Sequence, residues 1–281
     1  MAIKIIADST CDIGKKLAAE YDITLIPLNV IMGDKTYRDG VNITPKDIFA
    51  WAAEAKSTPK TATPDMGLVM DILKPYKDAG DEVICFCISE AFSGTAQTVR
   101  LAAQEIEFDR IHVINSMNLS TGIALQILRA ADLVKEGKSA EEIVAIIEAE
   151  REKVCSSFCI DTLTYLHRGG RCSGVAALLG AALMLKPMIA VKDGKMGVEK
   201  KYRGKIAKVL KDYAKDLEPR LRMARKDRIF ITHTTDDAIV QEIYNYVKSL
   251  DLFENIYIAE AGSVISSHCG PGTLGLLFCL E

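Results

Sequence analysis

Short apolar runs alternate with amphipathic stretches through the first half of the chain. The runs with the length of buried strands are residues 3–7, 24–32, 82–88 and 111–114. Apolar residues at helical spacing separate these runs, at residues 16–21, 48–55, 66–76, 95–106, 121–135 and 140–154. Strands that alternate with helices in this way are typical of an α/β fold, with a mostly parallel sheet and helices on its faces.

From about residue 155 the pattern changes. Shorter strand-like runs are expected at residues 187–191, 197–202, 229–232, 255–259 and 274–279. Helices are expected over residues 175–184, where small side chains dominate, and over residues 206–217 and 238–250. We therefore predict two domains that divide near residue 155.

A hydroxyl-rich loop joins the predicted strand at residues 82–88 to the helix that begins at Thr95. It contains Ser89, Ser93 and Gly94. A strand-to-helix junction points backbone N–H groups and the positive end of the helix dipole at one place, which suits an anion. Ser93 and Thr95 could equally serve only as caps of the helix, as their residue types often do.

Polar residues also follow two other predicted strands and fill a loop with two prolines. Asp8 and Ser9 follow the first strand, and Ser116 follows the strand at residues 111–114. Thr63 lies in the loop of residues 57–65. Open α/β sheets place ligand groups at the carboxyl ends of their strands, so these side chains are candidates for an additional part of a binding pocket.

Composition limits the possible functions. The chain has 281 residues, 49% of them hydrophobic, and a formal charge of −3, so it has no net positive charge to favour nucleic acid or anionic membranes. Its eight cysteines show neither a CxxC pair nor zinc-ligand spacing, as expected in a reducing cytoplasm. The start lacks a secretion signal, and the most apolar span, residues 175–185, is too short to cross a bilayer. We expect a cytoplasmic protein without stable membrane insertion.

Common catalytic and cofactor motifs give little support to an enzyme. The GxGxxG pattern at Gly270–Gly275 has only six residues after it, so it cannot be a dinucleotide fingerprint. His268 lies in a glycine-rich turn where a ligand could approach, although a structural role is an alternative. Ser93, His268 and Asp8 could form a hydrolase triad only if the fold brought them together.

Several short motifs, each weak alone, occur in a specific order. They are Asp8-Ser9-Thr10-Cys11-Asp12, Lys60-Thr61-Ala62-Thr63-Pro64, Ile88-Ser89 with Ser93-Gly94-Thr95, Leu163-x-x-Leu166-x-x-Gly169-Gly170-Arg171, Lys186-Pro187, Arg203, and His268-x-Gly270-Pro271-Gly272. Together they resemble the DegV family of bacterial fatty-acid-binding proteins, the lipid-presenting subunits of fatty acid kinase systems.

The resemblance implies an N-terminal mostly parallel α/β/α domain over residues 1–155 and a C-terminal α+β domain over residues 156–281. A long-chain fatty acid would lie in a tunnel between them. The implied contacts with its carboxylate are Thr61, Ser93, Gly94, Thr95 and His268. No metal or cofactor is implied beyond the bound fatty acid.

The chain departs from the family pattern in two places. Residues 61–65 are Thr-Ala-Thr-Pro-Asp, where the family usually has Thr-Ser-Gln-Pro-Ser, and Glu90 replaces a serine. Ala62 removes a hydroxyl group, so the hydrogen bonds to the head group, or the ligand itself, could differ. The small-residue stretch at residues 174–185 is a candidate lining of the tunnel or an ordinary core helix. Its large side chains include Leu178, Leu179, Leu183 and Met184.

The family role is not catalysis by this chain. A separate fatty acid kinase subunit would phosphorylate the presented carboxylate, and the acyl phosphate would feed phospholipid synthesis. Arg171 and Arg203 are the candidate contacts with that kinase, although either could form a structural ion pair. The alternatives are a serine hydrolase or acyltransferase that uses Ser93 and His268, and a regulator whose bound lipid signals to a protein partner.

Overall fold

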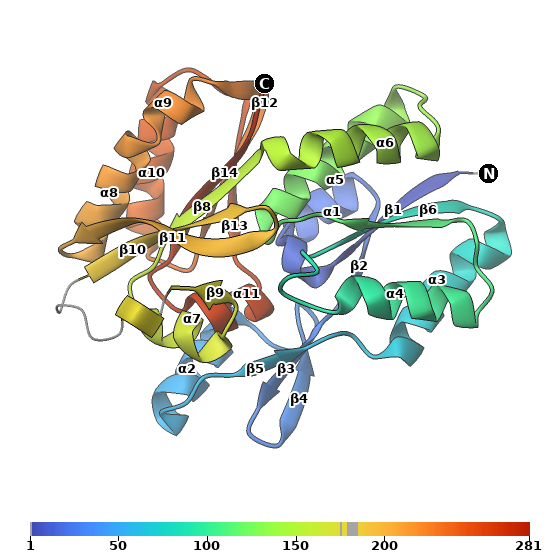
Figure 1. The fold of residues 1–281 in the computed structure, drawn as a ribbon, viewed down its shortest axis with the longest axis horizontal. Helices are drawn as coiled ribbons and strands as arrows, with labels where there is room; N and C mark the ends of the chain where they lie inside the picture. The colour runs from blue at the N-terminus through green and yellow to red at the C-terminus, as the bar shows by residue number, and fades with distance from the viewer. Residues whose placement is uncertain (1, 175, 179–184) are drawn as a thin grey trace.

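The structure, a computed structural model, describes residues 2–174, 176–178 and 185–281. Three sheets and their helices pack into one molecule (Figure 1). The first sheet consists of four parallel strands in the order β2 (Ile23–Ile26), β1 (Ile3–Asp8), β6 (Glu82–Cys87) and β7 (Ile111–Asn115). The predicted α/β class is confirmed.

Alternate side chains of the four-stranded sheet face two layers of helices, as the two-residue repeat of a strand requires. Ile6, Val83 and Cys85 pack with α3 (Met66–Ala79) and α4 (Thr95–Glu105). Residues on the opposite face pack with α1 (Gly14–Glu20), α5 (Thr121–Lys135) and α6 (Ala140–Glu150). The carboxyl ends of β1 and β6 therefore emerge between these layers.

A small antiparallel sheet lies beside the first one. Its strands are β4 (Lys35–Arg38), β3 (Asn29–Met32) and β5 (Lys60–Ala62), packed with α2 (Pro45–Ala55) and α11 (Ser263–Cys269). The single strand predicted at residues 24–32 is wrong, because the chain leaves β2 at Pro27 and enters a different sheet at β3. Proline has no N–H to continue a ladder, so a break there is expected.

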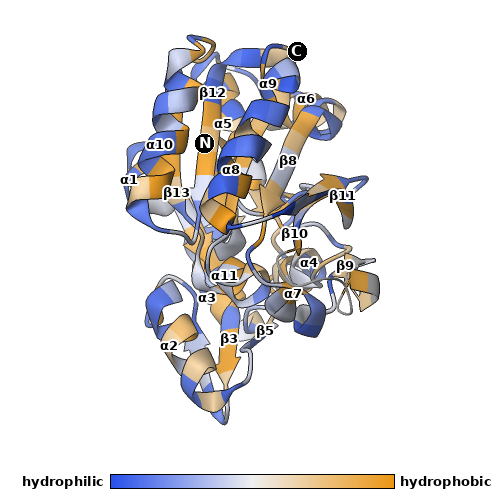
Figure 2. Cartoon of the chain, turned by 90° about the vertical axis from the view of Figure 1, so that its left-hand side faces the viewer, coloured by the Kyte–Doolittle hydropathy of each residue, from blue (hydrophilic) through white to orange (hydrophobic). Residues whose placement is uncertain are grey.

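The third sheet is mixed and has seven strands. Their order is β13 (Asn255–Glu260), β12 (Ala224–His233), β14 (Leu274–Leu280), β8 (Val154–Cys159), β10 (Leu185–Lys192), β11 (Lys195–Arg203) and β9 (Cys172–Ser173). Helices α8 (Ile206–Asp216), α9 (Glu218–Leu221) and α10 (Asp237–Ser249) belong to this half of the chain. Figure 2 shows hydrophilic outer faces on α8 and α10, with hydrophobic strands beneath them.

Helix α5 connects the two large sheets. It contacts β1 and β6 of the first sheet, and β8, β12 and β14 of the third. Eleven of its fifteen residues are buried, because both sheets cover it. The division at residue 155 stays a prediction; β8, the first strand of the third sheet along the chain, begins at Val154.

Short elements complete the fold. They are α7 (Leu163–Gly169) and three 3₁₀ turns, η1 (Ser9–Cys11), η2 (Arg151–Lys153) and η3 (Ala176–Leu178). Of the candidate tunnel stretch, Leu178 is buried in η3, whereas Leu179, Leu183 and Met184 lie outside the described residues. No described helix is long and apolar enough to cross a membrane.

Candidate functional site

A cavity of about 270 Å³ lies where the three sheets meet. Its apolar lining comes from all parts of the fold, including Leu28, Ile88, Phe92, Phe158, Val264 and Leu277. Such walls favour an apolar ligand, because burial of each methylene group contributes about 0.8 kcal/mol.

Polar side chains from distant segments also line the cavity. Thr61 lies in β5, and Thr63 follows the end of that strand. Ser93 and Gly94 directly precede α4, and His268 lies in α11. The fold thus brings together four of the five residues expected to hold a carboxylate. The fifth, Thr95, is fully buried and is not among the lining residues.

Thr61 and His268 form a hydrogen-bonded pair. The Oγ1 atom of Thr61 lies 2.8 Å from Nε2 of His268, across 207 residues of sequence. The pair forms because α11 packs against the small sheet that contains β5. The sequence pattern did not predict α11, since its small polar residues between two glycines are typical of a turn.

Burial fixes the charge of His268. Burial, with a smaller contribution from the nearby positive charge of Arg171, lowers the pKa of the imidazole from 6.5 to about 4. His268 is therefore neutral at pH 7. Its Nδ1 atom is buried without a hydrogen-bond partner, and a Cβ added at Gly169 would lie 2.3 Å from it.

The tautomer of His268 follows from these surroundings. A buried N–H without an acceptor is rarer than a buried acceptor without a donor, so the proton belongs on Nε2. Nε2 then donates to Thr61 Oγ1, and the hydroxyl proton of Thr61 is free to be donated to a third group. The pair can thus bind an anion although it carries no charge.

The start of α4 provides a second set of donors. Gly94 is the N-cap residue of this 11-residue helix, and no side chain caps the helix there. The hydroxyl groups of Ser93 and Thr95 lie 2.8 Å apart and bond to each other. Uncapped N–H groups and the helix dipole favour negative charge at this point.

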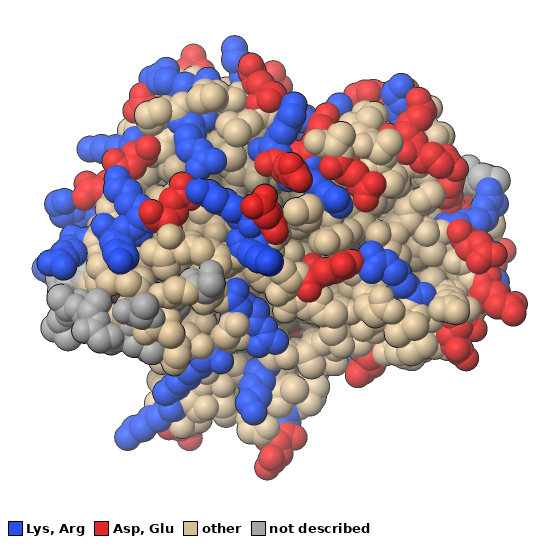
Figure 3. Space-filling model, in the orientation of Figure 1, with Lys and Arg blue, Asp and Glu red and all other residues tan. Residues whose placement is uncertain are grey.

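The two candidate arginines lie in different places. Arg171 is exposed, lines the cavity, and donates from Nη1 to the carbonyl oxygen of Gly169 at 2.6 Å. Arg203 is exposed at the end of β11, opposite Leu185, and does not line the cavity. In Figure 3, basic side chains gather over the half of this face that contains β10 and β11.

The other polar candidates lie outside the cavity lining. Asp8 is buried and accepts hydrogen bonds from the N–H groups of Thr10, at 3.0 Å, and Ile88, at 2.7 Å. Ser9 Oγ donates to Asp39 at 2.8 Å, and Ser116 Oγ donates to the carbonyl oxygen of Asn118 at 3.2 Å. These contacts hold loops together at the strand ends.

Two buried aspartates attach α11 to the N-terminal half of the chain. Asp12 accepts from the N–H of Gly262 at 2.8 Å, and Asp39 accepts from the N–H of Ser263 at the same distance. Both bonds end at the start of the helix that carries His268. Sequence reasoning missed this role, because the partners are 250 and 224 residues apart.

The pH dependence of stability should separate His268 from Asp8. Unfolded histidine binds a proton below pH 6.5 and folded His268 only below about 4, so the contribution of His268 to the free energy of unfolding falls by about 3 kcal/mol as pH falls from 6.5 to 4. Burial raises the pKa of Asp8 from 3.8 to about 6, so its contribution is lost as pH rises through 6.

The two effects oppose each other between pH 4 and 6. Compared with the unchanged protein, urea denaturation of His268→Gln should show stability that falls more steeply with rising pH in this range, whereas removal of the carboxyl group in Asp8→Asn should shift the slope the opposite way. Burial also raises the pKa of Asp12 and Asp39, in the same direction as Asp8. Equal pH slopes in the two variants would contradict this assignment.

The geometry of a serine hydrolase is not assembled among the described residues. Ser93 Oγ bonds to Thr95, His268 Nε2 bonds to Thr61, and Asp8 bonds to η1 and Ile88. Nucleophilic catalysis needs a base within hydrogen-bond distance of the nucleophile. One group of described side chains that could hold a metal ion, Glu82, His112 and Glu141, lies outside the cavity lining.

Comparisons with known proteins cover the whole chain. The model of the DegV family, described as "Uncharacterised protein, DegV family", matches residues 2–281. A DegV domain-containing protein of Deinococcus radiodurans is 31% identical over 280 residues, which is 98% of each chain.

Solved structures share the fold. A Thermus thermophilus DegV family protein, described by its fatty acid binding, superposes with a TM-score of 0.92 at 32% identity, over 100% of both chains. A stearic acid-binding protein of Eubacterium ventriosum gives a TM-score of 0.87 at 28% identity, over 100% of this chain and 98% of that one.

Proposed function

Since the chain belongs to the DegV family, we propose that its cavity binds a long-chain fatty acid with the carboxylate at Thr61. The observation that carries this proposal is an apolar cavity with the Thr61–His268 pair in its lining. The fatty acid binding described for the Thermus and Eubacterium proteins supports it.

Neutral donors hold the carboxylate in this arrangement. His268 donates to Thr61, Thr61 donates to one carboxylate oxygen, and the start of α4 with Ser93 faces the head group. A buried carboxylate is tolerated only when it is hydrogen-bonded, and bonds to a charged acceptor are about twice as strong as neutral ones. Arg171 adds a positive charge in the lining of the same cavity.

The departures from the family pattern at residues 62 and 90 leave these donors in place. Ala62 lines the cavity without a hydroxyl group, next to Thr61. The carboxylate of Glu90 forms an ion pair with Arg100 at 2.8 Å and does not line the cavity. We therefore infer that Thr61 and Ser93, rather than residue 62 or 90, provide the hydroxyl contacts.

The head-group assignment is tested by a binding titration that compares a long-chain acid with the alcohol of equal chain length. Both bury the same alkyl chain, so a difference in affinity reports the carboxylate contacts. We expect the acid to bind more tightly. Equal affinities would contradict the placement of a carboxylate at Thr61, and no saturable binding of either would contradict a lipid cavity.

The protein would present the carboxylate to a separate fatty acid kinase for acyl phosphate formation, without catalysing the reaction itself. Arg171 beside the cavity and exposed Arg203 support a contact with an acidic partner surface or a phosphate. We expect this presentation to take place in the cytoplasm.

Charge reversal at Arg203 tests the kinase contact. We expect Arg203→Glu to bind fatty acid normally, because Arg203 does not line the cavity, and to lose acyl phosphate formation with the kinase. Lys16→Glu, an equal charge change on an exposed residue of α1, is the control. Acyl phosphate formation that is unchanged in Arg203→Glu would count against this docking surface. Ester turnover that is lost in Ser93→Ala would instead support a hydrolase.

A further inference from the structure

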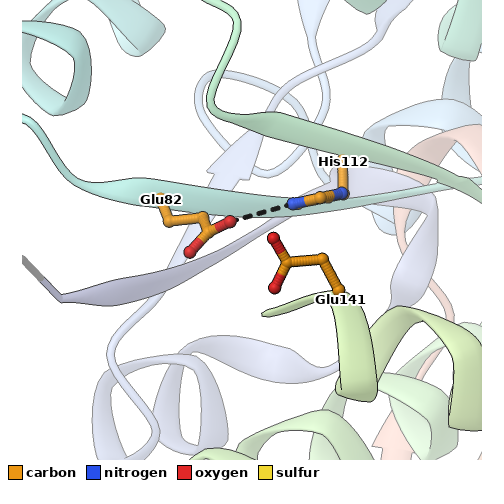
Figure 4. A group of neighbouring side chains, drawn as sticks. All are labelled: Glu82, His112 and Glu141. Atoms are coloured by element: carbon orange, nitrogen blue, oxygen red, sulfur yellow. Dashed lines mark hydrogen bonds and ion pairs between the residues drawn. The ribbon is translucent and has the colours of Figure 1, made fainter. Parts of the chain in front are cut away.

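Three side chains distant in sequence converge at one edge of the four-stranded sheet. Glu82 begins β6, His112 is in β7, and Glu141 lies in the first turn of α6. One ligand atom from each lies within 4.8 Å of the other two, and His112 Nε2 is 3.1 Å from Glu82 Oε1. Figure 4 shows both carboxylates directed towards the imidazole.

Three separately fixed backbone segments hold this group. In the parallel pair of β6 and β7, Ile84 is opposite His112. Glu82 lies two residues before Ile84, so its side chain is on the same face of the sheet as those of Ile84 and His112. The start of α6 is fixed by a capping box between Ser139 and Glu142. The three side chains therefore share one place without needing a ligand to gather them.

The charges at this place do not cancel. Among the described residues, neither Glu82 nor Glu141 forms an ion pair with a lysine or arginine, and His112 is the one ion-pair partner of Glu82. Like charges so close repel each other. Glu141 is exposed, so an ion from solvent can reach the group.

We propose that Glu82, His112 and Glu141 form a binding site for a divalent transition-metal ion such as zinc. One imidazole nitrogen and two carboxylate oxygens would be the protein ligands, and water would complete the tetrahedron. Ligand atoms around tetrahedral zinc are separated by about 3.3 Å, given metal–ligand bonds near 2 Å. Small side-chain rotations would bring the three atoms to that spacing. A nitrogen ligand favours zinc over magnesium or calcium, which prefer oxygen.

This site is independent of the fatty acid. Glu82 and His112 lie near the beginning of their strands, whereas the cavity is lined by residues that follow the other end of β6, such as Ile88. A bound ion would connect α6 to the sheet. It would stabilise the folded protein, because only the folded chain brings the three ligands together.

The test uses the full-length protein without an affinity tag, kept reduced. Zinc binding is measured by calorimetry and thermal unfolding, and cobalt is added as a spectroscopic probe of the ligands. We expect one ion per chain and a rise in melting temperature. His112→Gln and Glu141→Gln should each weaken binding by at least about tenfold and abolish the rise. His167→Gln, which removes an exposed histidine elsewhere, should change neither.

Several results would overturn the proposal. One is a zinc affinity of His112→Gln that equals that of the unchanged protein. A second is a cobalt spectrum with thiolate bands, which would indicate cysteine ligands. A third is the absence of saturable zinc binding at submillimolar concentration. Glu141 is exposed, so Glu141→Gln keeps the test valid if the histidine variant does not fold. Magnesium in place of zinc should give no tight binding.

Discussion

The Thr61→Val variant is expected to bind a long-chain fatty acid roughly 10- to 100-fold more weakly than the unchanged protein. Valine keeps the shape of threonine but removes the hydroxyl group that bonds to His268 and that we propose donates to the carboxylate. Affinity falls for two reasons: the carboxylate loses one hydrogen bond, and the imidazole N–H of His268 is left without an acceptor. Competition with a fluorescent fatty acid measures it.

The matched control for Thr61→Val is Thr36→Val. Thr36 is exposed in β4 of the same small sheet and does not line the cavity. Its replacement should leave the affinity unchanged. If Thr61→Val and Thr36→Val both bind the fatty acid with the same affinity as the unchanged protein, the Thr61–His268 pair does not hold the head group.

Gly169→Ala should have the second large effect. Alanine usually stabilises a helix relative to glycine, but a Cβ at this position would lie 2.3 Å from Nδ1 of His268. The imidazole must then move, and its 2.8 Å contact with Thr61 is lost. We expect affinity for the fatty acid to fall by about tenfold or more, with a loss of stability of about 1–3 kcal/mol.

Gly67→Ala is the control for this substitution. Gly67 also lies in a helix, α3, and an added Cβ there meets no atom within 4 Å. It should bind fatty acid normally and be slightly more stable, as urea denaturation would show. An unchanged affinity in Gly169→Ala would mean that the position of His268 does not matter for binding.

Elements with a strong local signal were predicted well from sequence. The helix expected at residues 121–135 is α5 without any change of bounds, and the capping box at Ser139 and Glu142 marks the start of α6. The hairpin across Asp193-Gly194 is formed by β10 and β11. In each case the apolar spacing or the turn residues alone specify the structure.

Long-range contacts could not be predicted in the same way. Strand β5 has three residues in a loop with two prolines, and it pairs because β3 lies beside it. Helix α11 lacks an apolar repeat and is held by Asp12 and Asp39 from the other half of the chain. The contact between Thr61 and His268 depends on both of these elements.

The family resemblance added Thr61 and combined it into one site with Ser93, Gly94 and His268, which local patterns had already made candidates. Thr61, Ser93, Gly94 and His268 all line one cavity. Asp8, Ser9 and Ser116, inferred from the positions of strand ends, are outside that lining and form hydrogen bonds within the loops there. A polar residue at a strand end is thus a candidate for either role, and only the fold separates them.

The most direct test of the fatty acid account is native mass spectrometry of the protein purified without detergent, followed by denaturation and solvent extraction. We predict a single added mass per chain that is released on denaturation and matches a long-chain fatty acid. The added mass should diminish in Thr61→Val. A protein without added mass, which also stays unbound after incubation with a panel of fatty acids, would contradict the account.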